Sequence, residues 1–238
     1  MILRLIAAAL LIAACPAIAV GAKPGAKTAA RSAPRPVQPA DWTRLVRVTA
    51  DGHFVRGNPA AKVKLIEYAS FTCPHCAAFA AESVGPLEAL IRSGQVSLEF
   101  RPALRDMLDL GAAITVRCAG PTRYFGMMQA VFADQNGWIE RGVAHLQAQG
   151  DDKRPAPVRV RAAADAAGFT ALARKQGLSA AQLNACFADA RRNQQLVTQA
   201  QAHWKRITGT PSFFIGDEKL EAGDWATLEP ILQARLAR

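Results

Sequence analysis

The chain has 238 residues, half of them apolar, and a formal net charge of +10 at neutral pH. This length and apolar content allow a substantial core in one large domain or two small ones. Five of the 29 lysines and arginines precede Asp41, where no acid occurs, so residues 41–238 carry 24 basic against 19 acidic side chains. No basic patch interleaved with aromatic residues is evident there, which argues against nucleic-acid binding.

Residues 1–19 have the pattern of a secretory signal peptide. Arg4 precedes ten apolar residues, 5–14, a stretch too short to span a bilayer, and Ala17-Ile18-Ala19 supplies a small-x-small cleavage site. A lipobox-like sequence ending at Cys15 overlaps this site and offers lipidation of Cys15 as an alternative. Pro16 directly after that cysteine favours ordinary cleavage. Either route predicts export to the periplasm.

Residues 20–40 contain four basic residues and four prolines among alanines. Such a segment buries too little apolar surface to fold, so it predicts a disordered tether. Residues 45–48 then alternate, and residues 52–57 are consistent with an edge strand before the turn at Gly57-Asn58-Pro59. We assign no role to His53 in this segment.

The central motif is Cys73-Pro74-His75-Cys76. Residues 63–71 before it have the β-branched and aromatic content of a strand buried on both faces. Residues 77–83 after it are alanine-rich and helical by propensity. Pro74 suits the first helical position, because its fixed φ fits the helix and its missing N–H would have no partner there. The spacing therefore predicts Cys73 as the N-cap.

A thiol at a helix N-cap faces free backbone N–H groups and the positive end of the helix dipole, which favour the thiolate. We therefore predict Cys73 as a nucleophile. His75 can donate to the same sulfur, and Cys76, one turn later, can close a disulfide with Cys73. A strand, a loop and a helix around this spacing are typical of a redox motif.

Three other interpretations compete with the redox one. A zinc site needs about four ligands, and the chain has no second Cys-x-x-Cys. Haem attachment needs histidine directly after the second cysteine, where Ala77 stands. A purely structural disulfide would stabilise little, because its loop is short. We therefore expect no metal and no cofactor other than the redox-active pair Cys73 and Cys76.

The remaining elements follow in order. Residues 95–101 alternate as a strand that closes a βαβ unit. After them come helices expected at 107–118, 122–133, 138–149, 157–167, 169–176 and 179–206, separated by breaks at Gly120-Pro121, Asn136-Gly137 and residues 151–155. Large apolar side chains in this block can line a peptide groove, but their helical spacing favours a core: Phe125, Met127, Met128, Phe132 and Trp138. A strand at 211–215, a turn at 216–220 and a helix at 224–236 end the chain.

Cys118 and Cys186 both fall in the helical block. In an exported protein two such cysteines are expected to pair, and closing a loop of this length is worth about 4 kcal/mol in the chain-entropy account. Two buried free thiols are the alternative.

At this point the chain resembles a known family. Glu67 six residues before the motif, the strand at 65–72 and the dipeptide Pro74-His75 look like the thioredoxin-fold thiol oxidants of the DsbA type. Downstream, Gly209-Thr210-Pro211-Ser212 followed by an apolar strand looks like the cis-proline loop of that family. The resemblance covers about residues 48–238. It implies a cis bond before Pro211 that places the Thr210 backbone beside Cys73, where it can pair with an extended substrate.

The resemblance implies an α/β thioredoxin fold with a helical domain inserted between the βαβ unit and the cis-proline strand. Residues 41–101 would form the N-terminal part of the thioredoxin fold, residues 102–207 the insertion, and residues 208–238 the C-terminal part. We further expect Glu67 to be buried beneath the motif, where desolvation would raise its pKa, and to serve as proton acceptor for Cys76; a solvent-facing strand glutamate is the alternative.

The sequence thus predicts an enzyme that donates the Cys73–Cys76 disulfide to reduced, unfolded exported proteins through a mixed disulfide at Cys73. The resemblance implies reoxidation by a membrane partner of the DsbB kind, coupled to quinone, and a monomer is expected. Thr210 departs from the valine of the best-known oxidant and is found in disulfide isomerases, so an isomerase or reductase is the alternative. A non-catalytic chaperone, or a Cu(I) carrier that uses Cys73, His75 and Cys76, is the minority interpretation.

Overall fold

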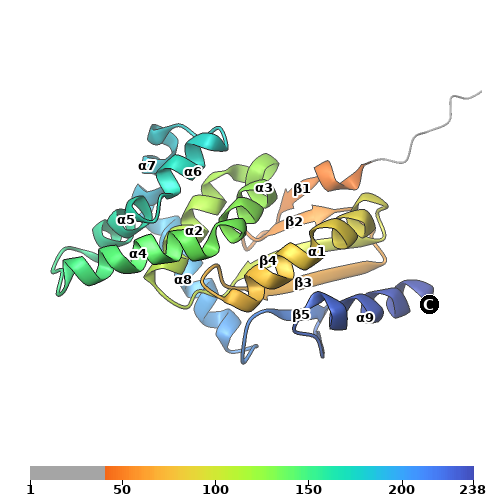
Figure 1. Ribbon diagram of the computed structural model, residues 1–238. Coiled ribbons are helices and arrows are strands. Elements are labelled where there is room, and N and C mark those ends of the chain that lie inside the picture. The colour runs from red at the N-terminus through yellow and green to blue at the C-terminus, as the bar shows by residue number, and fades with distance from the viewer. Residues whose placement is uncertain (1–40) are drawn as a thin grey trace, which may run out of the picture. The chain divides into compact units, whose positions relative to one another are not determined.

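The computed structural model describes residues 41–238, which form a six-stranded sheet flanked by helices (Figure 1). The strand order is β1-β2-β4-β3-β5-β6; β3 and β4 run parallel and every other neighbouring pair is antiparallel. The strands are β1 (Val46–Val48), β2 (Phe54–Gly57), β3 (Val63–Ala69), β4 (Val96–Pro102), β5 (Ser212–Ile215) and β6 (Glu218–Leu220). The helices are the 3-10 turn η1 (Trp42–Arg44), α1 (Pro74–Arg92), α2 (Met107–Cys118), α3 (Gly120–Ala133), α4 (Gln135–Gln149), α5 (Ala156–Ala166), α6 (Phe169–Lys175), α7 (Ala180–Ala188), α8 (Ala190–Trp204) and α9 (Trp225–Ala237).

The predicted βαβ unit is present as β3, α1 and β4. The two strands pair in parallel, with Leu65 opposite Leu98 and Glu67 opposite Phe100. Because successive side chains of a strand point to opposite faces, Leu65 and Glu67 lie on the face that α1 covers, and Tyr68 lies on the other. A glutamate thus occupies a core position between apolar neighbours.

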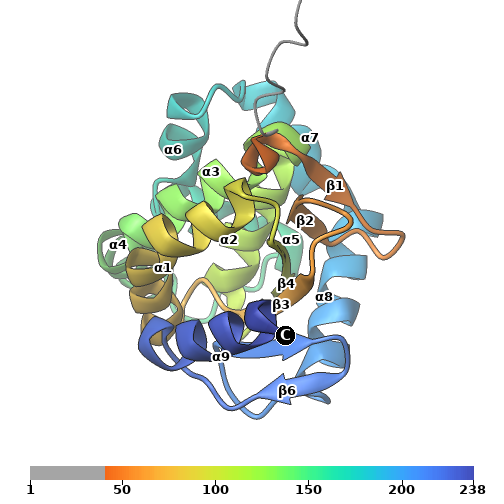
Figure 2. The same ribbon diagram turned by 90° about the vertical axis from the view of Figure 1, so that its right-hand side faces the viewer.

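Helices cover the two faces of the sheet unequally. The larger core lies between the sheet and α1, α3 and α9, and it continues into the helical block without interruption. Figure 2 shows α1 on one side of β3 and β4 and α8 on the other. Under α8 lies a smaller apolar cluster of Tyr68, Ala103, Ile207 and Phe214. The larger apolar core therefore lies on the side of the sheet that carries the motif.

The block from α2 to α8 stands between β4 and β5, as the sequence predicts. Its large apolar side chains are interior residues: Met127 is fully buried, and the Trp138 indole N–H donates to the Val131 carbonyl oxygen at 2.8 Å. Phe125, Met128 and Phe132 are 4–5% exposed. The core interpretation of these side chains is confirmed.

Three helix boundaries differ from the prediction. The break expected at Gly120-Pro121 lies at Ala119, so both residues belong to the first turn of α3. The helix expected over residues 179–206 is divided at Asp189, whose side chain accepts from the Arg192 N–H and so caps a new helix. The break expected at Asn136-Gly137 lies two positions earlier, at Asp134, so both residues belong to the first turn of α4. Asp189 caps its helix through its side chain, whereas Asp134 makes no side-chain capping bond.

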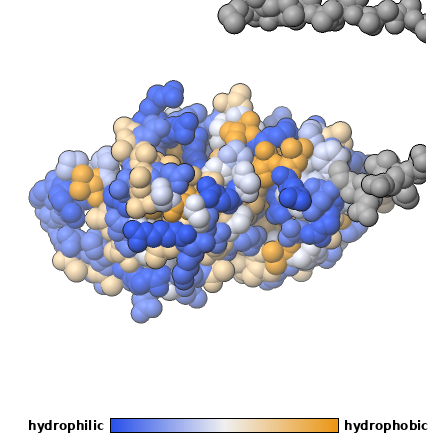
Figure 3. All heavy atoms as spheres, turned by 90° about the horizontal axis from the view of Figure 1, so that it is seen from above, coloured by the Kyte–Doolittle hydropathy of each residue, from blue (hydrophilic) through white to orange (hydrophobic). Residues whose placement is uncertain are grey.

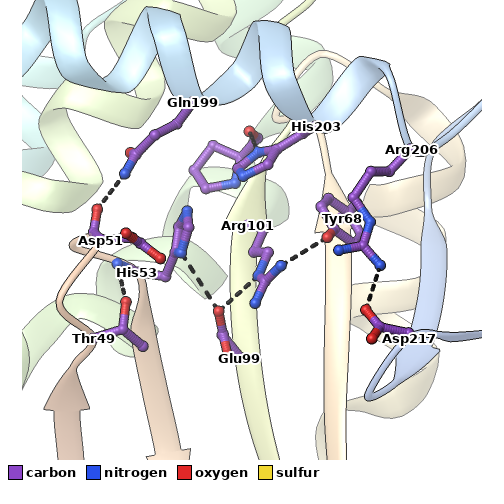
Figure 4. Close-up of polar contacts among 11 residues, drawn as sticks. Thr49, Asp51, His53, Tyr68, Glu99, Arg101, Gln199, His203, Arg206 and Asp217 are labelled. Carbon is purple, nitrogen blue, oxygen red and sulfur yellow. Dashed lines mark hydrogen bonds and ion pairs between the residues drawn. The ribbon is translucent and has the colours of Figure 1, made fainter.

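The segment at residues 54–57 is also placed differently. β2 pairs with both β1 and β4, so β1 and not β2 is the edge strand. His53, to which the sequence assigns no role, is only 7% exposed and faces His203 of α8 with ring centroids 5.1 Å apart. Its Nδ1 lies 3.5 Å from a Glu99 carboxylate oxygen. Figure 4 shows this row of polar side chains, which continues from Glu99 to Arg101 and Tyr68 beneath α8.

The signal peptide at 1–19, the tether at 20–40 and the candidate lipidation site Cys15 lie outside the described residues and stay predictions. Within residues 41–238, no helix is both long and apolar enough to cross a membrane. In the view of Figure 3 the apolar residues on the surface form separate spots among hydrophilic ones.

Candidate active site

The Cys-x-x-Cys motif lies where β3 passes into α1. Cys73 is the N-cap, with extended φ and ψ, and Pro74 is the first helical residue. The Cys73 carbonyl oxygen accepts from the Cys76 N–H at 3.1 Å and from the Ala77 N–H at 3.2 Å, which starts the helix. The sulfur at this position therefore lies at the positive end of a helix of 19 residues.

The Cys73 sulfur is set up to ionise. It is 4% exposed, and its pKa is lowered from 9.0 to about 5. The largest cause is a hydrogen bond from the Cys76 side chain; the Thr210 side chain and the backbone N–H groups of Cys76 and His75 add to it, against the opposing effect of burial. Because the thiolate is the reactive form, the lowered pKa favours the reactive state of the Cys73 sulfur at neutral pH.

Cys76 behaves in the opposite way. Its side chain is fully buried, and both cysteines are free thiols in this structure. Burial raises the pKa of Cys76 far above the ordinary range, and hydrogen bonding to Cys73 and the nearby Glu67 carboxylate push it in the same direction. A Cys76 thiolate is therefore unstable unless a proton reaches it.

Thr210 and Pro211 lie beside the first thiol. The Thr210–Pro211 peptide bond is cis, and the Cys73 thiol donates to the Thr210 carbonyl oxygen at 3.1 Å across 137 residues of sequence. β5 begins directly afterwards, and its Ser212 pairs with Tyr68 of β3. The sheet thus fixes the proline loop against the start of α1.

His75 is exposed, and its contribution differs from the one expected. Among residues 41–238 no hydrogen bond joins the imidazole to the Cys73 sulfur, and it is the backbone N–H of His75 that lowers the pKa of Cys73. The imidazole instead lines an open groove of ≈ 750 Å³ beside the cis-proline loop, together with Glu82, Thr210 and the segment 219–224. The groove is therefore connected to the thiol through Thr210, which lines the groove and accepts from Cys73.

Glu67 lies in the core under the motif. It is 2% exposed, and burial raises its pKa from 4.5 to about 8. Across residues 41–238 it has no hydrogen-bond partner, so desolvation of the carboxylate is not offset. Burial therefore favours the protonated form of Glu67 at neutral pH.

Two polar residues of the site were not predicted from the sequence. Gln135 of α4 is 5% exposed and donates from Nε2 to the carbonyl oxygens of Phe71 and Cys73 at 2.8 and 2.9 Å. Asp109 of α2 is fully buried and accepts from the Phe71 N–H at 2.9 Å and from the Ser70 hydroxyl at 2.5 Å. Burial raises the pKa of Asp109 to about 7, opposed by these hydrogen bonds. Both residues tie the motif to the helical block.

Neither residue has a signal in the sequence that points to the motif. The hydrogen bonds of Gln135 to the loop join residues more than 60 positions apart, and those of Asp109 join residues 38 or 39 apart. The one local hint is Asp106, three residues before Asp109 and the N-cap of α2, which marks the start of a helix.

Cys118 and Cys186 form a disulfide in the structure, with Cα atoms 5.9 Å apart, which links α2 to α7. Among residues 41–238 no group of three or more histidine, cysteine, aspartate or glutamate side chains is arranged to hold a metal ion.

A strand that leads into a dithiol at a helix N-terminus, with a cis-proline loop against the first sulfur, defines a dithiol protein of the thioredoxin fold. A protein-family model described as Thioredoxin matches residues 49–234. The chain therefore belongs to the thioredoxin family, and the helical block between β4 and β5 makes it a DsbA-like member. The fold class and the resemblance found in the sequence are confirmed.

Similar proteins agree with this assignment. The protein-disulfide isomerase of Novosphingobium aromaticivorans is 32% identical, with a TM-score of 0.72 over 80% of this chain and 100% of that one. Alpha-DsbA1 of Wolbachia pipientis shares the fold at 21% identity and a TM-score of 0.63, over 80% of this chain and 94% of that one.

Curated relatives match over shorter parts of their length. Two proteins named "Putative protein-disulfide oxidoreductase" are 32% identical over 100 residues, in Rickettsia conorii, and 24% identical over 174 residues, in Rickettsia bellii. These matches cover 40% and 72% of this chain. The chain spans 36% and 60% of the length of these two relatives.

Proposed function

We propose that this protein is an exported thiol:disulfide oxidoreductase that donates the Cys73–Cys76 disulfide to reduced proteins. The observation that carries the proposal is the lowered pKa of Cys73, about 5, beside a Cys76 whose pKa is raised. A stabilised thiolate lowers the free energy of the reduced enzyme, so its disulfide becomes a stronger oxidant.

The reaction has two exchange steps. A substrate thiolate attacks the Cys73 sulfur, the enzyme S–S bond breaks, and Cys76 leaves as a thiolate that takes up one proton, which Glu67 is placed to give. A second substrate thiolate then attacks the substrate sulfur of the mixed disulfide, and Cys73 leaves as a thiolate. The substrate loses two electrons and two protons; the enzyme keeps the electrons and one proton, and solvent receives the other.

The groove beside Thr210 suits a polypeptide substrate. It holds ≈ 750 Å³ and is lined by His75 of α1, by Thr210, whose carbonyl oxygen Cys73 contacts, and by the segment 219–224. An extended chain lying there can pair with the Thr210 backbone while its cysteine meets Cys73. Reduced, unfolded exported proteins fit this site better than a compact folded partner.

Export, reoxidation and assembly complete the proposal. The signal-like pattern at residues 1–19 supports a periplasmic location, with a lipid anchor through Cys15 as the variant form. Repeated turnover requires a membrane reoxidant of the DsbB kind, and we expect a monomer. Incorporation of a palmitate analogue that is lost in Cys15→Ala would demonstrate the anchor.

A second candidate is a disulfide isomerase or reductase. Thr210 before the cis proline favours it, and the solved protein at 32% identity is named an isomerase. An isomerase needs the enzyme to remain reduced, so the two functions differ in redox potential. A Cu(I) carrier or a chaperone without catalysis is a third candidate, for which neither thiol exchange nor turnover is expected.

The deciding experiment is the equilibrium of the oxidised and reduced protein against a glutathione buffer, with the Cys73 pKa measured from thiolate absorbance in the same preparation. We expect a potential more oxidising than the glutathione couple and an acidic Cys73, and Cys73→Ser to lack both the exchange and the absorbance step. A strongly reducing potential with an ordinary thiol pKa would overturn the oxidase and favour the reductase or isomerase.

A further inference from the structure

Two buried polar side chains without partners share one cavity behind the dithiol. Glu67 of β3 and Ser83 of α1 are 2% and 3% exposed, and within residues 41–238 neither side chain makes a hydrogen bond. Leaving such groups dry and unpaired is costly, on the order of 1–3 kcal/mol each. We therefore expect water molecules in this cavity to bind to these two side chains.

The cavity has room for that water. Its volume open to water is ≈ 40 Å³, and about 10–15 Å³ suffices for one molecule, so two or three waters fit. Most of the wall is apolar, formed by side chains of α1, β4 and α3, including Phe79, Leu98 and Phe132. A few waters between apolar walls can bond only to one another and to the polar groups at the ends.

The outer end of the cavity lies at an ion pair. Arg56 of β2 and Glu88 of α1 also line it; their Nη2 and Oε1 atoms are 2.7 Å apart, and their side chains are 19% and 31% exposed. Gln129 of α3 lines the same cavity. Polar groups therefore line the cavity from the buried carboxyl to the surface.

This cavity is separate from the substrate surface. The groove beside the cis proline is lined by residues such as His75, Thr210 and Asp224, and it shares no lining residue with the cavity behind Glu67. Cys73 is covered by substrate in the mixed disulfide, when the buried Cys76 needs its proton. A proton that arrives through the groove would have to cross the substrate contact.

We propose that the cavity between α1, β4 and α3 holds a short chain of waters that exchanges protons between Glu67 and bulk solvent at the Arg56–Glu88 pair, with Ser83 as the positioning residue of that chain. The inference rests on the proposed function. When Cys76 leaves as a thiolate, Glu67 gives it one proton and becomes a carboxylate. The waters then return one proton from solvent to Glu67, and reoxidation of the dithiol runs the same path in reverse.

The groups near the ends of this path fit such a use. Glu67 lies near Cys76 at the inner end and adds to the rise in the pKa of Cys76, while burial alone raises the pKa of Glu67. Tyr124 of α3 is fully buried near Glu67, and burial raises its pKa, so it stays neutral and does not compete for the proton. Among the described residues that line the cavity, Glu67 is the one titratable group inward of the Arg56–Glu88 pair.

The test is Ser83→Val, which removes the hydroxyl and fills the cavity. Oxidised protein is mixed with a small dithiol, and the rate of reduction is followed by stopped flow across pH in H₂O and D₂O. We expect about a tenfold slower step with a larger solvent isotope effect, in the range ascribed to a proton-transfer group. Ala81→Val places the same side chain on an exposed position of α1 and should match the wild type.

Double variants separate a proton path from a packing effect. In a Glu67→Gln background the path has no inner end, so Ser83→Val should slow the reaction no further. If Ser83→Val does not fold, Ser83→Ala with Gln129→Leu replaces it. The water path would be overturned if Ser83→Val slowed the reduction equally in the wild-type and Glu67→Gln backgrounds, or did not slow it at all. Either result would leave the oxidase function intact. Failure of the wild type to oxidise any dithiol would overturn the proposed function instead.

Discussion

The sharpest test of the interior of this protein is the pH dependence of its stability in Glu67→Gln. Burial raises the pKa of Glu67 from 4.5 to about 8 in the folded state, and the unfolded chain regains the ordinary value. Between these two values the folded protein holds a proton that the unfolded chain does not. Since stability rises with pH only where the unfolded state binds more protons, this group makes stability fall as pH rises.

The magnitude follows from the linkage. The free energy of unfolding falls by about 1.4 kcal/mol per pH unit through this window, so the loss reaches about 3 kcal/mol at pH 7 and about 5 kcal/mol above pH 8. Glutamine at position 67 keeps the shape of the protonated acid and does not ionise. We therefore expect the difference in the free energy of unfolding, Glu67→Gln minus wild type, to increase by these amounts from about pH 5 to pH 8. Any difference in packing between the two side chains adds a constant that does not vary with pH.

Urea unfolding of the reduced proteins, followed by far-UV circular dichroism across this pH range, measures the difference. Taking the difference cancels every other titrating group that the two proteins share, including Asp109. Glu82→Gln, at an exposed position of α1, is the matched control and should differ from wild type by an amount that does not vary with pH. A flat difference for Glu67→Gln would show that the carboxyl ionises within the fold and would refute the desolvation argument.

Three further outcomes are expected. Replacing Cys118 and Cys186 by alanine opens a loop with a sequence separation of 68 and should lower the free energy of unfolding in urea by about 4 kcal/mol; no loss would mean that the unfolded chain is not constrained by the disulfide. Gln135→Leu leaves the Phe71 carbonyl oxygen without its donor, while the Cys73 carbonyl oxygen keeps the Cys76 and Ala77 N–H groups, and should cost about 1–3 kcal/mol in the same assay; an unchanged midpoint would mean that water replaces the lost amide. Burial lowers the pKa of His53 from 6.5 to about 3, so the neutral imidazole contributes stability that is present above pH 6.5 and is lost as pH falls. His53→Phe should therefore reduce the fall in the free energy of unfolding at acidic pH. An equal dependence of that free energy on pH in both proteins would contradict this prediction.

The secondary structure around the motif depends on residues that are close together in the chain. The sequence is therefore sufficient to predict it. A proline at the first helical position, a thiol side chain before it, an apolar strand ahead of the motif and an alternating strand after the helix determine β3, α1 and β4. The position of Cys73 at the N-cap, and with it the direction of its pKa, follows from this local sequence. The cis-proline loop came from the resemblance to a family and not from residue spacing.

The partners of the motif depend on how distant segments pack, and only the tertiary structure decided them. Gln135 and Asp109 reach the loop from helices that begin more than 30 residues after it, and His53 is buried because α8 folds back over the sheet. The cavity behind Glu67 exists because the side chains of α1, β4 and α3 leave a gap between them. Burial, and the shift of a pKa that follows from it, is a property of all the atoms around a group, and a linear pattern contains only the neighbours along the chain.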